Sequence, residues 1–424
     1  MSRPELVYDA LRQWLDGPSG LEEAIRRTVD DGLFPEEDVQ FAVSHLRKSL
    51  SIDVLERWWK RAGCDSDPVL NPVSESGSGS DLESGLESDL ESGSESGSDP
   101  YRNPSRSPLK ILCLHAGNLP LVGLQDVVAV LLSGNRYHGK LSRKDPWLLA
   151  SLLEVCRELL IPETTEYYTD IGHFKDLKAD TVLFAGSGMS VPKVRAELDR
   201  LHAVHPGTKY LIRTAQTSVA LIEKKDSADD LLEAVTRYQG RGCRSVSVVV
   251  SPLGLDQYNL PVSHEDVKNQ FAPISGRHSQ TELESRLYPE PESQPGFQNK
   301  PESESESEPH PHSQLYSDRD RAQLYRIAYA GAVGKLFRRV GSWLFLEIED
   351  ADQAGKAGPG VVLWMRGDED TVDAVCSVLA GRLQTVYSDS GREELEPLEK
   401  AQRPEFDWKP DGMDTLQWLK EAGN

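Results

Sequence analysis

Residues 110–146 read KILCLHAGNLPLVGLQDVVAVLLSGNRYHGKLSRKDP and contain a strand–helix–strand pattern. Lys110–His115 is a short apolar run of the kind that forms a buried strand. Leu121–Ser133 carries apolar residues at helical spacing, and Gly134 follows as a helix C-cap signal. Arg136–Leu141 then resumes as a strand. This order predicts two parallel strands joined by a crossover helix.

The same alternation continues downstream as far as residue 238. The predicted elements are a helix from Asp145 to Leu160, a strand at Thr181–Ala185, a helix at Val191–His202, strands at Lys209–Ile212 and Val219–Ile222, and a helix at Ala228–Tyr238. Alternating strands and helices are typical of an open parallel sheet covered by helices, the architecture of Rossmann-type nucleotide-binding domains. The fold class predicted from the sequence is therefore α/β.

Residues 1–65 precede this pattern and are predicted to form small helices. Pro35 stands at a first helical turn ahead of acidic residues, and Ser51 is placed to cap the next helix. Trp58 and Trp59 belong to the apolar stripe of that helix. The tryptophan pair is expected to pack onto the main body of the protein; a lipid or partner site is the alternative interpretation.

Two acidic segments interrupt the chain, at 66–106 and at about 276–314. Residues 74–99 carry eight acidic residues and no basic one, and residues 281–309 carry a net charge of −6. Polar, repetitive segments of this kind cannot bury enough apolar surface to offset their chain entropy, so both are predicted to be disordered insertions. The whole chain carries −22, so removing −8 and −6 leaves −8 on the rest.

The composition limits the class of protein. The 424 residues are enough for two or three domains. The net charge argues against a nucleic-acid-binding protein, and no run approaches the roughly 18 apolar residues of a membrane span. The N-terminus carries charges where a signal peptide has its apolar core, which favours a cytoplasmic protein. The five cysteines show no CxxC pair and no zinc spacing, so neither a disulfide framework nor a metal site is expected.

Tyr238–Pro252, YQGRGCRSVSVVVSP, contains a candidate nucleophile, Cys243. Glycines on either side of Arg241 keep side chains away from the sulfur, and Arg241 and Arg244 add positive charge that favours a thiolate. Ser245–Val250 has the pattern of a strand entering a core. A cysteine beside such a strand suggests a nucleophile on a rigid element; a buried structural cysteine next to a tight turn is the alternative.

Gly186 and Ser187 form a candidate phosphate site. They follow the predicted strand Thr181–Ala185 and precede a helix, where backbone N–H groups and the helix dipole favour an anion. The motif is not GxGxxG, and a Gly-Ser turn after a strand also occurs without any ligand.

Four separated segments, taken in order, resemble the LuxC-type acyl-CoA (fatty acid) reductase family of the aldehyde dehydrogenase superfamily. His115–Pro146 resembles the family's HAGN-x-P block and the K-x-S block after it, and Phe184–Ser187 resembles the superfamily's F-x-GS turn. Tyr238–Pro252 resembles the family's catalytic segment, and Ala401–Leu419 its C-terminal DG-x-DT block. The resemblance covers most of the chain outside the acidic segments, and four motifs in order are more specific than any one of them.

The resemblance implies roles at individual positions. Cys243 would be the nucleophile that accepts the acyl group as a thioester. Asn118 falls where the superfamily has the side-chain amide of its oxyanion hole, and a thioester carbonyl that develops negative charge needs such preorganised donors. Lys140 and Ser142 fall where the superfamily holds the adenosine ribose of a nicotinamide cofactor.

The resemblance also bears on the choice of cofactor. Gly186 and Ser187 would approach the pyrophosphate or ribose region. Arg143 and Lys144 favour a 2′-phosphate, so NADPH (NADP) is expected over NADH; the alternative is that each is simply a surface base.

One stretch departs from typical aldehyde dehydrogenases. Those enzymes carry a glutamate in an E-L-G-G block that activates water against the thioester, whereas the matching stretch here, Tyr210–Ser218, has no carboxylate. Without a general base the acyl-enzyme should persist until hydride or another thiol arrives. Glu347 or Glu349 could supply a base from elsewhere. The expected reaction is therefore reduction of a fatty acyl-CoA to a fatty aldehyde.

The expected architecture is aldehyde-dehydrogenase-like: an N-terminal helical segment (1–65), an acidic linker (66–106), a cofactor-binding domain (107–238), a catalytic domain (239–400) and a C-terminal arm (401–424). Alternative functions are an aldehyde dehydrogenase or acyltransferase that uses the same cysteine, and a non-catalytic superfamily member. Retention of Cys243, Asn118 and Lys140 together argues against the last. The expected partners are the fatty acyl-CoA substrate and, by analogy with the superfamily, a second copy of the chain or an acyl-donor protein.

Overall fold

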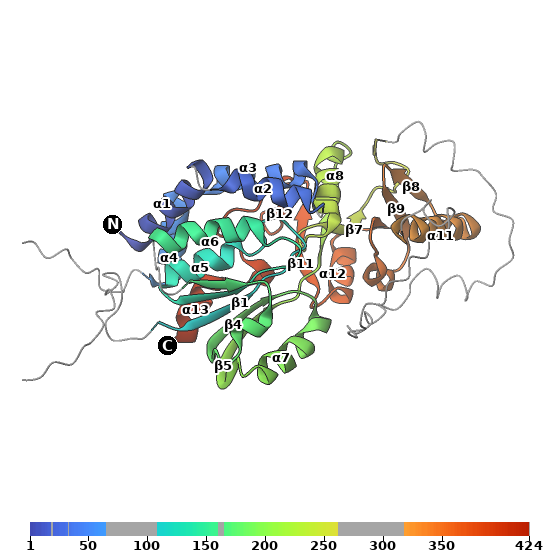
Figure 1. Ribbon diagram of the computed structural model, residues 1–424. Helices are drawn as coiled ribbons and strands as arrows, with labels where there is room; N and C mark the ends of the chain where they lie inside the picture. Colours follow the sequence, from blue (N-terminus) through green and yellow to red (C-terminus); the bar gives the residue numbers. More distant parts are fainter. Residues whose placement is uncertain (18–19, 33, 65–107, 160–164, 262–317, 424) are drawn as a thin grey trace, which may run out of the picture. The chain divides into compact units, whose positions relative to one another are not determined.

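The computed structural model describes residues 1–17, 20–32, 34–64, 108–159, 165–261 and 318–423 (Figure 1). The chain divides into two compact units: unit 1 comprises Met1–Arg213 and Glu405–Asn424, and unit 2 comprises Thr214–Pro404. The acidic segments predicted at 66–106 and about 276–314 lie outside the described residues. Within the described ranges, no helix is both long enough and apolar enough to cross a membrane.

Unit 1 is built on a five-stranded parallel sheet with the order β3-β2-β1-β4-β5. Its strands are β1 (Lys110–Leu114), β2 (Arg136–Lys140), β3 (Glu166–Tyr168), β4 (Ala179–Ala185) and β5 (Val204–Arg213). β1 lies in the centre and is buried from Ile111 to Leu114, because helices cover both faces of a parallel sheet. Its side chains alternate between two cores: Cys113 belongs to one and Leu112 to the other.

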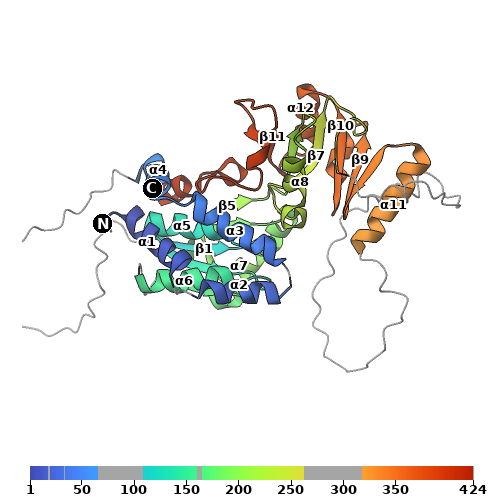
Figure 2. The same ribbon diagram turned by 90° about the horizontal axis from the view of Figure 1, so that it is seen from above.

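Helices cover both faces of this sheet. On one face lie α5 (Leu124–Ser133) and α6 (Trp147–Leu159), and on the other lies α7 (Val191–Arg200) (Figure 1). The core on the α5–α6 side is extended by α1 (Arg3–Asp16), α2 (Leu21–Asp30), α3 (Glu36–Ser49), α4 (Ile52–Arg61) and the C-terminal helix α13 (Thr415–Gly423). Figure 2 shows α1 and α2 alongside α6, which both helices contact.

The N-terminal helices behave as the sequence predicts. Ser51 caps α4, and its hydroxyl oxygen accepts a hydrogen bond from the backbone N–H of Val54 at 3.3 Å. Trp58 is 1% exposed, and Trp59 packs against the same core. The tryptophan pair therefore serves packing, as expected, because its apolar surface is covered by the chain itself.

Unit 2 contains a seven-stranded sheet with the order β12-β11-β6-β7-β10-β9-β8. Its strands are β6 (Thr217–Leu221), β7 (Val246–Ser251), β8 (Phe337–Val340), β9 (Trp343–Ile348), β10 (Val361–Arg366), β11 (Leu383–Ser388) and β12 (Glu396–Pro397). Only β8 and β9 pair in antiparallel fashion among these strands. Helix α8 (Ala228–Thr236) covers one face, whereas α11 (Asp318–Val333) and α12 (Glu369–Val378) contribute to the core on the other.

The boundary between the units differs from the domain boundary expected at 238/239. β6 and α8 belong to unit 2, so the division falls between Arg213 and Thr214. The reason is a choice of strand partner: β6 pairs with β7 and β11 and not with the sheet of unit 1. The alternation of strands and helices continues across this point, and a local pattern of that kind does not encode which strand is the partner.

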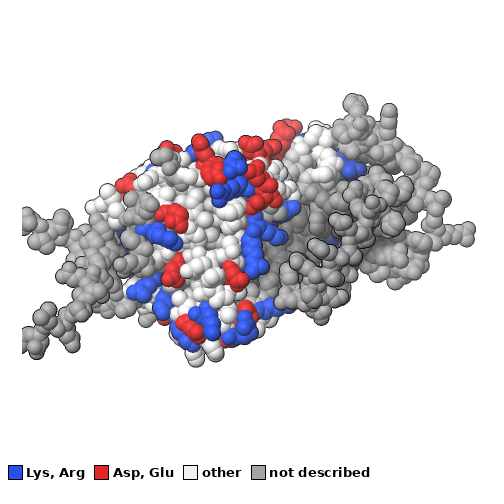
Figure 3. All heavy atoms as spheres, viewed as in Figure 1, with Lys and Arg blue, Asp and Glu red and all other residues white. Residues whose placement is uncertain are grey.

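The surface of the described residues mixes charges of both signs. Lys and Arg side chains are interspersed with Asp and Glu on the face shown in Figure 3. Several ion pairs join neighbouring turns of one helix, such as Arg26–Asp30 at 2.8 Å and Lys60–Glu56 at 3.3 Å. Exposed pairs of this kind contribute little to stability, so the apolar cores carry the fold.

Candidate active site

The residues predicted for the cofactor, together with Asn118 of the predicted oxyanion hole, lie at one edge of unit 1. β2, β1 and β4 are neighbouring parallel strands, so their carboxyl ends meet at the same edge of the sheet. The predicted residues follow these strands in turn: Asn118 after β1, Lys140 and Ser142 at the end of β2, and Gly186 and Ser187 after β4. In open α/β sheets, ligands bind in the crevice outside the carboxyl ends of the strands.

The loop that carries Asn118 begins at a buried histidine. His115 is 6% exposed, and its Nε2 lies 2.7 Å from the hydroxyl of Tyr137 on β2. Burial lowers the pKa of His115 to about 4, so the ring is neutral near pH 7. Gly123 closes the same loop, and a Cβ there would lie 2.1 Å from Nδ1 of His115. The histidine thus fixes both ends of the segment that presents Asn118, a half-buried residue.

The Asn118 loop also presses against the loop after β2. A Cβ on Gly117 would lie 1.9 Å from Oγ of Ser142, so only glycine fits this close approach. The Ser142 hydroxyl accepts a hydrogen bond from the backbone N–H of Lys144 at 3.1 Å, and the residue is 9% exposed. Ser142 therefore joins two loops of the site by packing and by capping its own turn.

Lys140 provides a half-buried positive charge at the last position of β2. Burial lowers its pKa, and the nearby Arg143 lowers it further. Within the described residues, no acceptor lies within hydrogen-bonding distance of its ammonium group. Arg143 is exposed and pairs with Asp170 at 3.3 Å. A half-buried ammonium without an acceptor is the arrangement expected where a ligand supplies the acceptor.

Gly186 and Ser187 both form hydrogen bonds within the fold, which the sequence does not indicate. The N–H of Gly186 donates to the carbonyl of Arg213 at 3.1 Å, which continues the β4–β5 ladder. The Ser187 hydroxyl accepts from the N–H of Met189 at 3.3 Å and caps a short 3₁₀ turn that leads into α7. The N–H of Gly186 is therefore not available to a phosphate, whereas the Ser187 hydroxyl keeps its proton to donate.

A stacked pair of rings, which sequence reasoning did not identify, stands beside Lys140. Tyr168 ends β3 opposite Lys140 and is 40% exposed. Its ring stacks on that of His173, with the ring centres 4.3 Å apart and an angle of 10° between the planes. Phe174 supports the pair edge-on at 5.7 Å and is buried. The stack therefore offers an exposed aromatic surface at the same edge of the sheet.

The candidate nucleophile lies in unit 2, in the turn that leads into β7. Cys243 is half-buried and stands three residues before the strand. The turn is sharply bent, because Tyr238, Gln239 and Gly240 all have positive φ, at 55°, 56° and 67°. A Cβ on Gly240 would lie 2.4 Å from the ring of Trp343, so this position requires glycine for space as well as conformation.

Arg244 does not have the role that the sequence indicates. It is 6% exposed; its Nε donates to the carbonyl of Ala401 at 2.8 Å and its Nη2 to that of Lys400 at 3.1 Å. Nη2 also pairs with the Glu396 carboxylate at 2.6 Å. The carboxylate of Glu396 therefore compensates the charge of Arg244, and the arginine side chain connects the Cys243 turn to residues 396–401.

A second connection holds the cysteine from β6. The Ser218 hydroxyl donates to the Cys243 carbonyl at 3.0 Å, and Ser218 is fully buried. Tyr387 on β11 is also fully buried and hydrogen-bonds with Ser218. Burial raises the pKa of Tyr387, so its phenol stays neutral near pH 7. The sequence assigns no role to Ser218 or Tyr387, and only the strand order brings them to the turn.

Strand register locates the carboxylates considered as substitute bases. Glu347 is level with Trp364, which is level with Val249 on β7. Val249 lies six positions after Cys243, which stands in the turn before the strand. Glu349 lies just past the end of β9. A base from Glu347 or Glu349 stays a prediction.

The stretch without a carboxylate has one charged residue near the end of β5. Arg213 is 7% exposed and forms a buried ion pair with Asp126, which stands in the first turn of α5. The pair joins the edge strand β5 to the helix layer. Arg213 is the one charged residue of the stretch Tyr210–Ser218.

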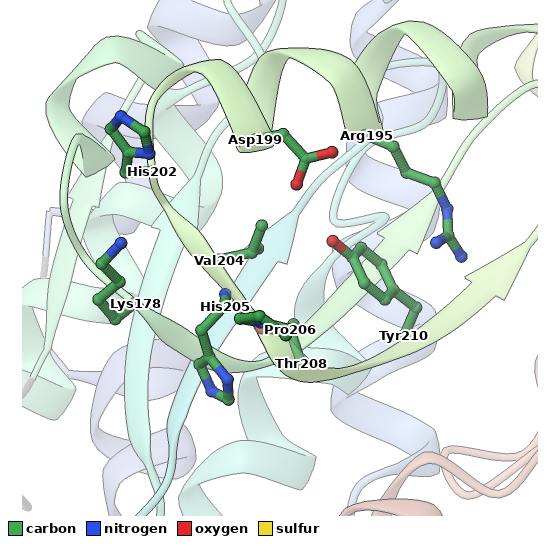
Figure 4. Close-up of a pocket in the computed structure, with 9 residues that line it drawn as sticks. All are labelled: Lys178, Arg195, Asp199, His202, Val204, His205, Pro206, Thr208 and Tyr210. Atoms are coloured by element: carbon green, nitrogen blue, oxygen red, sulfur yellow. Dashed lines mark hydrogen bonds between the residues drawn. The ribbon is translucent and has the colours of Figure 1, made fainter.

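A cavity of about 570 Å³ lies elsewhere in unit 1 (Figure 4). It opens between α7 and the amino-terminal end of β5, so it is at the opposite end of the sheet from Lys140. The guanidinium of Arg195 stands 4.1 Å from the ring of Tyr210, and Asp199 adds a negative charge. None of the residues predicted for the site lines this cavity. Across the described ranges, no group of three or more His, Cys, Asp or Glu could hold a metal ion.

Comparisons with known proteins identify the fold. The chain matches an oxidoreductase from Marinobacter aquaeolei with a TM-score of 0.51 and 12% identity, over 92% of this chain and 74% of that one. It also resembles aldehyde dehydrogenase 21 from Physcomitrella patens (TM-score 0.48, 11% identity, 91% and 72%) and 1-pyrroline-5-carboxylate dehydrogenase from Thermus thermophilus (0.49, 12%, 99% and 83%). No family model and no curated protein sequence matches. The expected aldehyde-dehydrogenase-like α/β fold is confirmed.

Proposed function

We propose that this protein is an acyl-CoA reductase of the LuxC type, which transfers the acyl group of a fatty acyl-CoA to Cys243 and reduces the thioester to a fatty aldehyde with NADPH. The observation that carries the proposal is a cysteine on an anchored turn of an aldehyde-dehydrogenase-like fold, where the stretch Tyr210–Ser218 lacks a carboxylate. The superfamily chemistry that this cysteine supports is covalent catalysis.

The missing carboxylate separates reduction from hydrolysis. Hydrolysis of a thioester needs a base that removes a proton from the attacking water. Arg213 is the one charged residue of Tyr210–Ser218, and Glu347 is level with Val249, six positions after Cys243 in the chain. An acyl group on Cys243 would thus persist long enough to be reduced. This favours an acyl-CoA reductase over an aldehyde dehydrogenase.

The carboxyl edge of unit 1 fits a nicotinamide dinucleotide. Lys140 offers a half-buried ammonium that lacks an acceptor within the described residues, and a ribose hydroxyl would provide one. The stack of Tyr168 on His173 would hold the adenine ring. Arg143 would exchange its exposed ion pair with Asp170 for a 2′-phosphate, because an exposed pair costs little to break. These contacts favour NADPH.

In the proposed reaction, the Cys243 thiolate attacks the carbonyl carbon of the acyl-CoA, and CoA leaves as a thiolate. Asn118 donates to the carbonyl oxygen while it carries negative charge. NADPH, when bound, supplies a hydride to the acyl carbon. The C–S bond to Cys243 then breaks, which releases the aldehyde and restores the thiolate. The hydrogen bonds of Gly186 and Ser187, to Arg213 and Met189, would hold the turn that lies beside the pyrophosphate.

A direct assay tests the proposal. Purified protein is mixed with a long-chain acyl-CoA and NADPH, and loss of NADPH absorbance is followed together with aldehyde formation. We expect both in equal amounts. Cys243→Ala should abolish them, and it should also abolish a hydroxylamine-sensitive acyl adduct on the protein. Cys376→Ala is the matched control, since Cys376 is the other half-buried cysteine of unit 2 and should leave both intact.

Other outcomes would redirect the assignment. Release of free fatty acid without NADPH oxidation would contradict the proposed reductase and favour a hydrolytic or acyl-transfer enzyme. Persistence of the adduct in Cys243→Ala would place the nucleophile elsewhere. Cys113 and Cys156 are poor substitutes, because burial raises the pKa of both thiols and keeps them protonated.

A further inference from the structure

We propose that Arg244 is a positioning residue for the nucleophile: it holds the Cys243 turn against residues 396–401, and Glu396 is its counter-ion. The inference rests on the proposed function of Cys243 as the acyl acceptor. It assigns to Arg244 a mechanical role in place of electrostatic activation of the thiol.

The contacts of Arg244 are those of an anchor. Its guanidinium uses two different nitrogens for three acceptors: the carbonyls of Ala401 and Lys400 and the carboxylate of Glu396. It also lies over the ring of Tyr387 at 5.3 Å. Since Arg244 is only 6% exposed, these groups replace water as its partners. The planar guanidinium, whose donors have fixed directions, can bind all three acceptors, whereas a lysine ammonium cannot.

The anchor acts on Cys243 through the backbone. Arg244 is the next residue in the chain, and the Cys243 carbonyl is itself held by Ser218 at 3.0 Å. The N–H of Ser245 closes the turn onto the carbonyl of Gly242 at 3.0 Å. The peptide units around the cysteine are therefore fixed on both sides, which limits the directions that its sulfur can take. A nucleophile misplaced by about 1 Å can lose roughly 100-fold in rate.

An electrostatic role is the competing explanation, and the surroundings argue against it. Arg241 and Arg244 lie in the turn, Arg237 begins the bent segment before it, and Glu396 pairs with Arg244. Arg244 and Glu396 compensate each other at 2.6 Å, so together they impose little net charge on the sulfur. Arg241 is exposed to solvent, where screening weakens its field.

Arg244→Lys separates the two explanations, because lysine keeps the positive charge and loses the planar arrangement of guanidinium donors. We expect three results in full-length protein. Hydrogen exchange in the segment 240–246 becomes faster. The burst of CoA released from acyl-CoA, measured without NADPH, slows roughly 10- to 100-fold at saturating substrate, with the half-saturating concentration unchanged. The pH midpoint for alkylation of Cys243 by iodoacetamide stays where it is in the wild type.

Matched variants complete the test. Arg366→Lys changes an exposed arginine of unit 2 at the end of β10, and it should alter none of the three measurements. Glu396→Gln retains an acceptor for the guanidinium and should slow acylation less than Glu396→Ala. Unfolding exposes the buried cysteines, so a variant that merely unfolds is recognised by alkylation of Cys64, Cys113 and Cys156 and by loss of its circular dichroism signal.

The outcomes distinguish the anchor role of Arg244, its electrostatic role and the proposed function of Cys243. Unchanged exchange in segment 240–246 of Arg244→Lys would overturn the anchor, and so would wild-type acylation in that variant. A shift of the alkylation midpoint in Glu396→Ala with no loss of acylation would favour the electrostatic role instead. If the wild-type protein releases no CoA while exchange still rises in Arg244→Lys, the proposed function fails and the anchor stands.

Discussion

The proposed cofactor site rests on single residues at the carboxyl edge of unit 1. Lys140, Arg143 and Asp170 supply polar groups, and Tyr168 with His173 supplies an exposed stacked ring pair. A polar edge with an adjoining aromatic surface matches the two chemical halves of an adenosine phosphate. The following two predictions concern residues of this edge.

The first prediction tests the stacked rings. Tyr168→Ala should weaken binding of 2′,5′-ADP and of 5′-ADP by roughly 10-fold or more, because stacking of a base on an aromatic ring is lost. Tyr168→Phe should bind both as the wild type does. Isothermal titration calorimetry measures these affinities without any turnover. Arg143→Gln should weaken only 2′,5′-ADP, and equal loss for the two nucleotides would argue against its role at a 2′-phosphate.

The second prediction concerns the buried histidine. His115 has a pKa of about 4 in the folded chain against its ordinary value of 6.5, so the unfolded state binds more protons between these limits. The contribution of His115 to the free energy of unfolding should therefore be fully present above about pH 6.5. It should be lost as the pH falls towards 4, by roughly 3 kcal/mol at most. Denaturant unfolding of wild type and His115→Gln across this range checks it. An equal pH slope in both proteins would contradict the assignment.

At the scale of elements, the C-terminal segment closes unit 1. Residues from Glu405 onward belong to that unit, and α13 contributes Leu416 and Leu419 to the same core as the N-terminal helices. Arg61 at the end of α4 pairs with Asp407 at 2.7 Å and with Asp414 at 2.9 Å. The chain thus uses its own last helix to cover α4 and α5.

The third prediction belongs to this junction. Asp414 is 9% exposed; it accepts from Nε1 of Trp58 at 2.8 Å and from the N–H of Gln417 at 3.2 Å, in addition to Arg61. Asp414→Ala leaves these donors without an acceptor and should lower the free energy of unfolding by about 2–4 kcal/mol. Glu421→Ala, on the exposed side of the same helix, should change it by less than about 0.5 kcal/mol. Denaturation of both variants measures the difference, and similar values would refute the junction.

At the scale of the whole molecule, the chain crosses from one sheet to another at residue 213 and returns at 405. The alternation of strands and helices predicts an α/β fold and locates β1, β2, β4 and the core of β5: β1 and β4 are largely apolar runs, and β2 follows the helix C-cap signal at Gly134. It does not predict β3, because Glu166–Tyr168 is short and mixes a charged residue with two tyrosines. The site residues that lie within local motifs could be predicted from the sequence, whereas Ser218, Tyr387 and Glu396 could not.

The sequence by itself determined the fold class, the apolar strands, the capped helices and the candidate cysteine, because each depends on neighbours within a few turns of chain. The tertiary structure alone decided that β6 pairs with β7 and β11, and with it the anchoring of Cys243. It likewise decided that Arg244 is buried and paired with Glu396. The physical reason is that partner strands and counter-ions come from residues about 25 to 170 positions away, which no local pattern specifies.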